Sequence, residues 1–476
     1  MTQLHIPHHV PCIIQGQATQ GLADSFAVLN PATERIIALC SSPSAEQIEY
    51  TISTAQHALS TWQHSDEATR KAVLMRIALG IEQHADELAQ LIVQEQGKPL
   101  SLAHTEVAAA IAWTRYQASL DLSPEVLQDD AEKRIELHHR PMGIVVSITP
   151  WNWPLMIAIW HIMPALRAGN VVINKPSEYT PLATAKLVQI MQRELPAGVV
   201  SILTGDAETG AQLSQHPLVN KIVFTGSIQT GLKIKQHTAA SFKHLTLELG
   251  GNDAGIVLPD SDLDKIAARI FNAAFINMGQ TCAALKRVYV HESQYAALSQ
   301  RLANLAETQI LGDGLAPETT FGPVQNAKHY QKVKQLITEA CTEGAQVLTT
   351  AQPLPAQGYF IAPTILIHVN AKSRVVQEEQ FGPVLPILSY QNVEQVLTEL
   401  QHSDYALGAS IWSSDIDKAQ RYIQHLNCGT VWLNTHAEVL PHVPFGGWKH
   451  SGLGVQFGQQ GLLENTLSQV IHIHKG

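Results

Sequence analysis

The segment Gly279-Gln280-Thr281-Cys282 places one thiol between two segments of different periodicity. Residues 262–278 are apolar with helical spacing and residues 286–290 have the composition of a strand, so the thiol lies on a glycine-bearing connection. A cysteine on such a connection is a candidate nucleophile, whereas an unpaired cysteine is also often a small buried apolar residue. Cys282 alone leaves both interpretations open.

A carboxylate ends another apolar run, in Leu247-Glu248-Leu249-Gly250-Gly251. The two glycines turn the chain, and open α/β sheets bind ligands at the carboxyl ends of their strands. Glu248 is therefore a candidate general base, because a glutamate in an apolar cleft has a pKa suited to proton transfer near neutral pH. A surface glutamate at a domain junction would give the same pattern.

Two further strand ends carry groups that suit a dinucleotide. Thr225-Gly226-Ser227 follows a strand pattern and opens a helical one, so backbone N–H groups there can hold a phosphate. This segment lacks the GxGxxG spacing and also fits a plain strand-to-helix turn. In Lys175-Pro-Ser-Glu178 a lysine and a carboxylate can bind a ribose, and Glu178 would then repel a 2′-phosphate. The alternative is a capped helix start.

The elements that must position these groups alternate between strand and helix. Short β-type runs separated by helical segments predict a parallel sheet, with strands at 144–148, 171–174, 199–203, 222–225 and 245–248. Residues 45–97 favour amphipathic helices. Residues 128–139, which are rich in charge and precede Arg140-Pro141, favour an exposed hairpin that can cross to another subunit. After Gly250-Gly251 a second series of helices and strands predicts a second α/β domain.

Composition limits the class of protein. A chain of 476 residues is long for one core and predicts two or three domains, and 45% hydrophobic with 15% charged residues is usual for an α/β enzyme. A net charge of -10 without a long basic run predicts no nucleic-acid partner. The first seven residues lack a targeting pattern, and no uninterrupted apolar stretch reaches about 20 residues, so neither a membrane span nor export is expected.

Cysteine usage adds two expectations. The five cysteines, at positions 12, 40, 282, 341 and 428, are an odd number without paired or CxxC spacing. They predict neither a disulfide framework nor a structural zinc site, and no metal is expected. Reduced thiols fit a cytoplasmic location.

Seven motifs occur together in an order and spacing that resemble the aldehyde dehydrogenase superfamily. They are Thr149-Pro-Trp-Asn-Trp-Pro154, Lys175-Pro-Ser-Glu178, Gly226-Ser227, Glu248-Leu-Gly-Gly251, Gly279-Gln-Thr-Cys282, Glu378-Glu-Gln-Phe-Gly-Pro383 and Pro444-Phe-Gly-Gly-Trp-Lys449. The resemblance covers essentially the whole chain, including Asn30-Pro-Ala-Thr33. It implies an α/β fold with a Rossmann-type nicotinamide-binding domain (1–120 and 141–249), an α/β catalytic domain (250–453) and a small β oligomerisation element (121–140 and 454–476). The implied assembly is a homodimer or homotetramer.

The resemblance also implies a role for each matching residue. Cys282 matches the nucleophile that forms a thiohemiacetal and then a thioester, Asn152 and the Cys282 backbone N–H match the oxyanion donors, and Glu248 matches the base that activates water. The other matches concern the cofactor, which is expected to be NAD rather than NADP. Lys175 and Glu178 match the adenosine-ribose contacts, Ser227 matches the pyrophosphate contact, Glu379 and Phe381 match residues that place the nicotinamide, and Trp151, Thr225 and Gly226 complete the set.

One departure from the family bears on the substrate. Members that oxidise succinate semialdehyde tend to have an arginine eight residues after the oxyanion asparagine, where this chain has Trp160. Trp153, Trp160 and Phe445 instead match an aromatic entrance tunnel of members that act on uncharged aldehydes, although they can equally pack the domain interface. An uncharged aromatic or aliphatic aldehyde is therefore the expected substrate.

Two other departures concern proton movement. His161 replaces a lysine often found after the tunnel position, and Gly454-Val455-Gln456 replaces the usual Gly-Arg-Glu. His161 can carry protons if its imidazole titrates near neutrality, or it can be a packed histidine.

The sequence thus predicts an NAD-preferring enzyme that converts an aldehyde to a carboxylic acid. A CoA-acylating relative is a second candidate, although such enzymes usually lack a glutamate equivalent to Glu248. A crystallin-like binding relative without turnover is a third, and it should lack the nucleophile that Cys282 provides.

Overall fold

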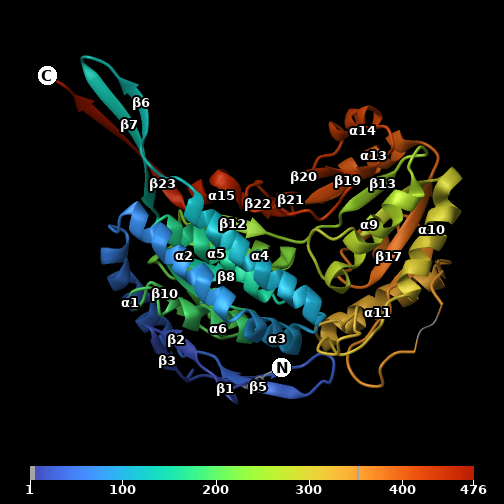
Figure 1. The fold of residues 1–476 in the computed structure, drawn as a ribbon, viewed down its shortest axis with the longest axis horizontal. Coiled ribbons are helices and arrows are strands. Elements are labelled where there is room, and N and C mark those ends of the chain that lie inside the picture. Colours follow the sequence, from blue (N-terminus) through green and yellow to red (C-terminus); the bar gives the residue numbers. More distant parts are fainter. Residues whose placement is uncertain (1–5, 351–352) are drawn as a thin grey trace.

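The computed structural model describes residues 6–350 and 353–476, and it has two lobes side by side with a long β arm (Figure 1). The expectation that the first seven residues carry no targeting pattern falls mostly on residues 1–5, which lie outside the described residues. Among the residues that are described, no helix is long and apolar enough to cross a membrane.

The first lobe is built on an eight-stranded sheet. In spatial order its strands are β22 (Gly452–Leu453), β12 (His244–Glu248), β11 (Val219–Thr225), β8 (Ile144–Ile148), β9 (Val171–Lys175), β10 (Val200–Ile202), β2 (Cys12–Ile14) and β3 (Gln17–Thr19). Strands β12, β11, β8, β9 and β10 run parallel, whereas β22 and β2 are antiparallel to their neighbours. The predicted parallel sheet is therefore confirmed, and its carboxyl edge carries Thr225, Lys175 and Glu248.

Eight helices accompany this sheet among the described residues. They are α1 (Ala45–Trp62), α2 (Glu67–Gln83), α3 (Ala85–Gln96), α4 (Leu100–Ser119), α5 (Pro154–Arg167), α6 (Leu182–Met191), α7 (Ala207–Gln215) and α8 (Ile228–Thr238). Helix α1 begins at a capping box in which Ser44 and Gln47 exchange hydrogen bonds, and α5 begins with proline at its first position.

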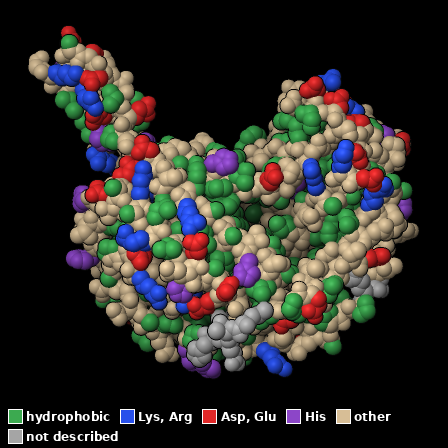
Figure 2. All heavy atoms as spheres, viewed as in Figure 1, with side chains coloured by type: hydrophobic (Ala, Val, Ile, Leu, Met, Phe, Trp, Pro, Cys, Tyr) green, Lys and Arg blue, Asp and Glu red, His purple; other side chains and the backbone are tan. Residues whose placement is uncertain are grey.

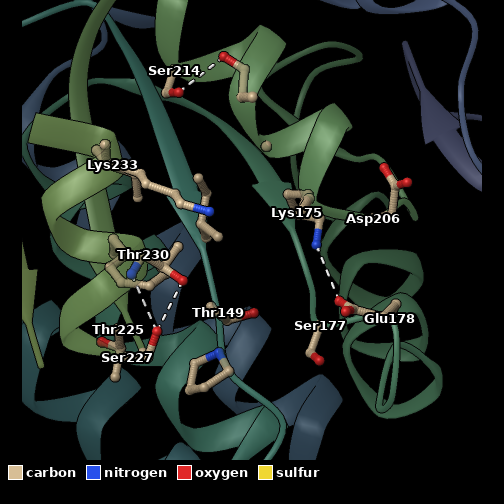
Figure 3. Close-up of a pocket in the computed structure, with 18 of the residues that line it drawn as sticks. Thr149, Lys175, Ser177, Glu178, Asp206, Ser214, Thr225, Ser227, Thr230 and Lys233 are labelled. Carbon is tan, nitrogen blue, oxygen red and sulfur yellow. Dashed lines mark hydrogen bonds and ion pairs between the residues drawn. The ribbon is translucent and has the colours of Figure 1, made fainter. Parts of the chain in front are cut away.

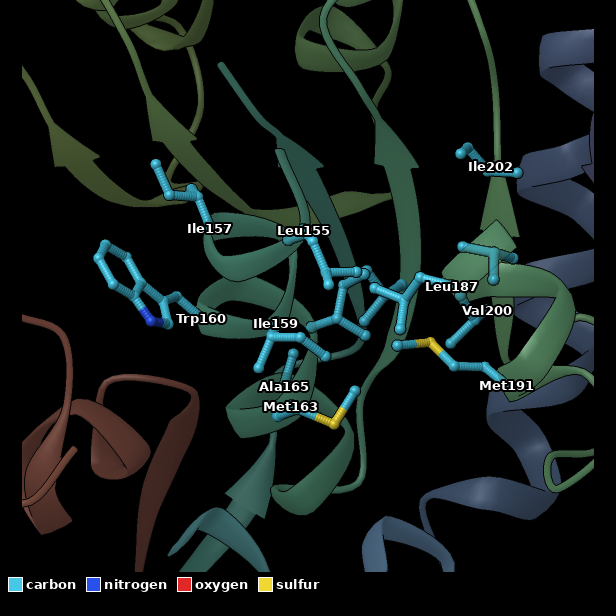
Figure 4. Packing of buried hydrophobic residues seen from close by; sticks show 14 of the residues in the cluster. Leu155, Ile157, Ile159, Trp160, Met163, Ala165, Leu187, Met191, Val200 and Ile202 are labelled. Carbon is cyan, nitrogen blue, oxygen red and sulfur yellow. The ribbon is translucent and has the colours of Figure 1, made fainter. Parts of the chain in front are cut away.

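Helix α5 is apolar on all sides because it is enclosed by other elements. Figure 4 shows its Leu155 and Met163 in one core with Leu187 and Met191 of α6, while Trp160 points away from α6 toward the C-terminal segment. The core therefore fixes the helix that follows the Thr149–Pro154 motif.

The second lobe is built on a seven-stranded sheet that the chain reaches after Gly250-Gly251. In spatial order its strands are β15 (Gln346–Val347), β16 (Thr364–Ile367), β17 (Val384–Tyr390), β14 (Arg287–His291), β13 (Ala254–Val257), β19 (Gly408–Trp412) and β20 (Thr430–Leu433). Its helical segments are α9 (Leu263–Phe275), the 3-10 turn η1 (Ile276–Gly279), α10 (Glu292–Glu307), α11 (Ala327–Thr342), α12 (Arg374–Gln377), α13 (Val393–Gln401) and α14 (Ile416–Ile423). The second α/β unit expected from the sequence is confirmed.

The arm is a three-stranded sheet of β6 (Glu125–Asp129), β7 (Lys133–Pro141) and β23 (Thr466–His474), and Figure 1 shows it extending away from both lobes. The predicted hairpin is confirmed, and β7 ends at Pro141. The remaining elements are α15 (Gly458–Leu463), a sheet of β1 (His9–Val10), β5 (Ile36–Ser41) and β4 (Ser25–Leu29), and the pair β18 (Tyr405–Ala406) and β21 (Trp448–Lys449).

Candidate active site

Cys282 follows a tight turn at the end of α9. Asn277, Met278 and Gly279 have positive φ angles of 50°, 55° and 72°, a conformation that non-glycine residues adopt rarely and asparagine tolerates best. Gly279 cannot carry a side chain there, because a Cβ atom would lie 2.3 Å from the Gly382 carbonyl oxygen. The turn is thus held against the 381–383 segment, and strain of this kind is common at functional sites.

Asn152 is held by the same turn. The Asn152 side-chain Nδ2 donates to the Gln280 carbonyl at 3.0 Å. The Asn152 backbone carbonyl accepts from Asn277 Nδ2 and from Lys98 Nζ, each at 2.9 Å. An amide nitrogen carries two N–H groups, so one fixes the Asn152 side chain and the second remains for a ligand.

Sequence reasoning missed a buried ion pair behind Asn152. Lys98 Nζ lies 2.6 Å from Glu106 Oε2 and 3.6 Å from the centre of the Trp153 ring. The other Glu106 oxygen accepts from the first two free N–H groups of α5. The pair therefore ties α4 to the start of α5 and to the Asn152 backbone, and no spacing of Lys98 and Glu106 in the sequence indicates this.

Cys282, Glu248 and Asn152 line one cavity of about 230 Å³. The cavity lies between the lobes, where Figure 2 shows the surface hollowed. Other residues that line it are Trp151, His329, Lys332, Glu379 and Phe381. A thiol, a carboxyl group and an amide donor around one space are the groups needed for nucleophilic attack on a carbonyl and for later proton transfer.

Glu248, the last residue of β12, is 5% exposed. Neither of its carboxyl oxygens has a hydrogen-bond partner among the described residues. Burial raises the pKa of Glu248 well above its ordinary value, which suits a proton acceptor near neutral pH. The alternative of a surface glutamate at a domain junction is wrong.

The surroundings of Cys282 disfavour its thiolate. Burial raises the pKa of the Cys282 thiol to about 12, and the carboxylates of Glu248 and Glu379 contribute in the same direction. The thiol is therefore protonated at neutral pH, and since the thiolate is the nucleophile, its proton must pass to a base. Glu248 is the unpartnered carboxylate in the same cavity.

A second cavity of about 760 Å³ adjoins the first, and five residues line both: Pro150, Trp151, Thr225, Gly226 and Ser227. Ser227 is the N-cap of α8, where its Oγ accepts from the Thr230 N–H at 3.2 Å. On the other wall Lys175 Nζ lies 3.5 Å from Glu178 Oε2 (Figure 3). The alternative of a helix start capped within this segment is wrong, because α6 begins at Leu182, after Pro181, and its N-cap makes no side-chain hydrogen bond.

The shape and charge of the two joined cavities fit an elongated ligand with a negatively charged middle. The N-terminus of α8 supplies unpaired N–H groups and a positive dipole end. Lys175 and Lys233 reach into the larger cavity from opposite walls (Figure 3).

The smaller cavity is also lined by a carboxylate and three rings. Glu379 Oε1 accepts from the Gly251 N–H at 3.2 Å, and a Cβ on the preceding glycine would lie 2.1 Å from Glu379 Oε2. The Trp151 ring centre is 5.3 Å from Phe381 and 5.6 Å from His329. His329 also hydrogen-bonds the Phe381 carbonyl oxygen at 2.6 Å, and it belongs to no sequence motif.

The three residues predicted to form an aromatic tunnel are buried in one core cluster. Trp153 Nε1 donates to Thr281 Oγ1 at 3.0 Å, so this ring touches the nucleophile turn. Trp160 and Phe445 meet through Phe457, whose ring centre is 4.7 Å from Trp160 and 6.0 Å from Phe445. These are packing contacts, and none of the three residues is among those that line the cavity with Cys282, so the tunnel stays a prediction.

His161 is a packed, hydrogen-bonded side chain on α5. Its ring nitrogens lie 3.1 Å from Ser147 Oγ and 2.9 Å from Thr225 Oγ1. Burial, with a smaller effect of Lys221, lowers the pKa of His161 to about 3. The expectation that this imidazole titrates near neutrality is wrong, because burial, which the sequence does not reveal, keeps it neutral. Gln456, at the position of the usual glutamate, is also buried and uncharged.

Solved structures share this fold over nearly all of the chain. The aldehyde dehydrogenase of Bacillus cereus, solved as an NAD+ complex, has a TM-score of 0.95 at 31% identity, covering 98% of this chain and 97% of that chain. An Escherichia coli structure described as an NADP-dependent enzyme has the same TM-score and identity and covers 98% of each chain.

Sequence comparison agrees. The model of the aldehyde dehydrogenase family matches residues 18–471. Phenylacetaldehyde dehydrogenase of Pseudomonas fluorescens is 38% identical in an alignment of 487 positions that covers 99% of this chain and 96% of that protein. The chain belongs to the aldehyde dehydrogenase family, and the predicted fold class is confirmed. It is an oxidoreductase that acts on aldehydes with a nicotinamide cofactor.

Proposed function

We propose that this enzyme oxidises an uncharged aldehyde to the carboxylic acid through a covalent intermediate on Cys282, with NAD as the oxidant. The observation that carries the proposal is the meeting of the Cys282 thiol, the Asn152 amide and the unpartnered Glu248 carboxyl group in one cavity.

The first half-reaction acylates the enzyme. The Cys282 thiol loses its proton to Glu248 or to water, and the Cys282 sulfur attacks the aldehyde carbon to give a tetrahedral thiohemiacetal. The second Asn152 N–H and the Cys282 backbone N–H donate to its oxyanion. When bound, the nicotinamide ring supplies the acceptor for the hydride, and loss of that hydride converts the thiohemiacetal to a thioester.

The second half-reaction releases the acid. Glu248, after any proton taken from the thiol has passed to solvent, accepts a proton from water while the water oxygen attacks the thioester carbon. The carbon–sulfur bond then breaks, sulfur leaves as the Cys282 thiolate, and the carboxylic acid is released. A CoA-acylating enzyme would pass the acyl group to a CoA thiol instead. The unpartnered Glu248 carboxyl group in the Cys282 cavity favours water, because it can accept the proton that a water nucleophile must lose.

The joined cavities fit a nicotinamide dinucleotide. Lys175 and Glu178 would hold the adenosine ribose, and Thr225, Gly226 and Ser227 would hold the pyrophosphate at the N-terminus of α8. Trp151, Glu379 and Phe381 would hold the nicotinamide half, where they surround the smaller cavity. The carboxylate of Glu178 favours NAD, because it would accept from a 2′-hydroxyl and repel a 2′-phosphate.

A preference for NAD over NADP is the first expected result. The Glu178 side chain is 39% exposed, so solvent screening limits the repulsion of the extra phosphate, and we expect about a tenfold higher kcat/KM with NAD. Glu178→Ser should narrow this difference, whereas Glu208→Ser, which removes another carboxylate from the same cavity wall, should leave it unchanged. Equal wild-type efficiency with both cofactors would contradict the role of Glu178.

The aromatic residues set the second expectation, which concerns the substrate. Trp153, Trp160 and Phe445 offer apolar surface and no cation, and burying an unpaired carboxylate against them would cost several kcal/mol. We therefore expect kcat/KM for phenylacetaldehyde, benzaldehyde or hexanal to exceed that for succinate semialdehyde by at least about a hundredfold. The product should be the free acid, formed at the same rate with and without CoA.

A matched pair of variants tests this explanation. Trp160→Arg should raise activity on succinate semialdehyde relative to hexanal, and Trp160→Phe, which keeps a ring and adds no charge, should not. Succinate semialdehyde as the better wild-type substrate would refute the apolar site, and acyl-CoA as the product would refute the hydrolytic step.

The same proposal extends to domains, assembly and location. Residues 1–120 and 141–249 form the cofactor domain, 250–453 the catalytic domain, and 121–140 with 454–476 the oligomerisation element. The exposed apolar residues of the arm, which include Leu127 and Val470, suit contact with another copy in a homodimer or homotetramer. All five cysteines are free thiols, which fits the cytoplasm.

A further inference from the structure

Lys286 is a buried lysine that follows Cys282 by four residues and directly precedes β14. Its Nζ donates to the Gly279 carbonyl oxygen at 2.7 Å and lies 5.0 Å from the centre of the Phe381 ring. Within the described ranges its Nζ has no carboxylate oxygen within the 4.0 Å of an ion pair. The ammonium group is therefore buried at the nucleophile turn without a direct counter-ion.

The other buried lysines include both arrangements. Lys98 forms an ion pair with Glu106 at 2.6 Å, whereas Lys221, like Lys286, has no ion pair within the described residues and donates to Thr246 Oγ1 and to the Glu464 backbone carbonyl. A buried charge without a direct partner is costly, and Lys286 is the one of these three whose ammonium group contacts the nucleophile turn, so it is a candidate for a functional role.

The charges that face Cys282 give Lys286 such a role. The carboxylates of Glu248, Glu379 and Asp253 all disfavour a negative charge on the Cys282 sulfur. The positive charge of Lys286 acts in the opposite direction and favours the thiolate.

Charges of both signs act on Lys286 itself. Burial lowers the pKa of Lys286 to about 8, while Glu379, Cys282 and Asp253 favour its protonated form and Lys332 disfavours it. The ammonium group is thus present at neutral pH and lost as the pH rises through about 8.

We propose that Lys286 is a positioning residue that anchors the nucleophile turn through the Gly279 carbonyl and stabilises the Cys282 thiolate by its charge. The inference rests on the proposed role of Cys282. In this step the sulfur–hydrogen bond breaks and the proton passes to Glu248 or to water, while Lys286 keeps its own proton.

Alkylation by iodoacetamide measures the thiolate without requiring catalysis. The rate of Cys282 modification is followed by peptide mass spectrometry across neutral and alkaline pH, which separates it from the exposed Cys341. Removal of the cation raises the pKa of Cys282, so Lys286→Gln should slow alkylation about tenfold at neutral pH, equivalent to about one pKa unit. The two rates should converge above pH of about 8, where wild-type Lys286 is itself neutral.

Two controls separate charge from structure. Lys286→Arg keeps the cation and should keep the wild-type profile. Lys221→Met removes an equally buried lysine that does not act on Cys282, and it should also keep the profile. An unchanged profile in Lys286→Gln, or an equal slowing at every pH, would overturn the proposal.

The wild-type protein provides the same test if Lys286→Gln does not fold. Its logarithmic alkylation rate should rise with pH, flatten over about one pH unit near the Lys286 pKa of about 8, and then rise again, and a rise without this flat stretch would overturn the proposal. Failure of this inference can be told apart from failure of the proposed function. If Cys282 forms an acyl-enzyme but its alkylation profile ignores Lys286, only this inference fails, whereas absence of an acyl-enzyme removes the covalent mechanism.

Discussion

Cys282→Ala is expected to reduce aldehyde oxidation by at least about a thousandfold, because loss of a required nucleophile removes the covalent route entirely. Binding of NAD should survive, since the larger cavity that would hold the adenosine half does not include Cys282. Nicotinamide absorbance measures the first quantity, and fluorescence titration with NAD measures the second.

The matched control for this variant is Cys341→Ala, which removes an exposed thiol on α11. It should retain wild-type turnover. Purified Cys282→Ala protein that keeps more than about a hundredth of wild-type kcat would contradict covalent catalysis.

Glu248→Gln is expected to separate the two half-reactions. Acylation should still release about one equivalent of reduced cofactor in a rapid burst, because water can take the thiol proton in place of Glu248. Steady-state turnover should fall about a hundredfold to ten-thousandfold, because no base then activates the water that hydrolyses the thioester. Stopped-flow absorbance measures both phases. Glu464→Gln, which changes a carboxylate outside the cavity, should behave as the wild type.

The pH dependence of deacylation follows from the same residue. The carboxylate acts as the base, and burial raises the pKa of Glu248 above its ordinary value, so wild-type deacylation should rise as pH rises through that raised pKa. Glu248→Gln should lose this dependence. Unchanged steady-state turnover in the variant would assign water activation to another group.

The sequence indicates the site well where strands end. Lys175, Thr225 and Glu248 follow apolar strand patterns, and parallel strands place their carboxyl ends at one edge of a sheet. The glycines beside them mark close approaches, as at Gly279 against Gly382. Local patterns and a general rule about sheets were therefore sufficient to bring these residues together.

The sequence does not indicate contacts that depend on packing between distant elements. His329 reaches the cavity from the surface of α11, with no motif around it, and Lys98 reaches the Asn152 backbone only because α4 packs on α5. The burial of a side chain also depends on packing between distant elements. The low pKa of His161 depends on neighbours from β8 and β11, and nothing in its local sequence reveals them.

Detection of the acyl-enzyme tests the covalent mechanism most directly. Glu248→Gln protein is mixed with phenylacetaldehyde and NAD, quenched in acid and digested, and the peptide that contains Cys282 is weighed by mass spectrometry. The mechanism predicts a mass increase of one phenylacetyl group on Cys282, formed only when NAD is present and absent from Cys341. No adduct during turnover, or an adduct on a different residue, would contradict it.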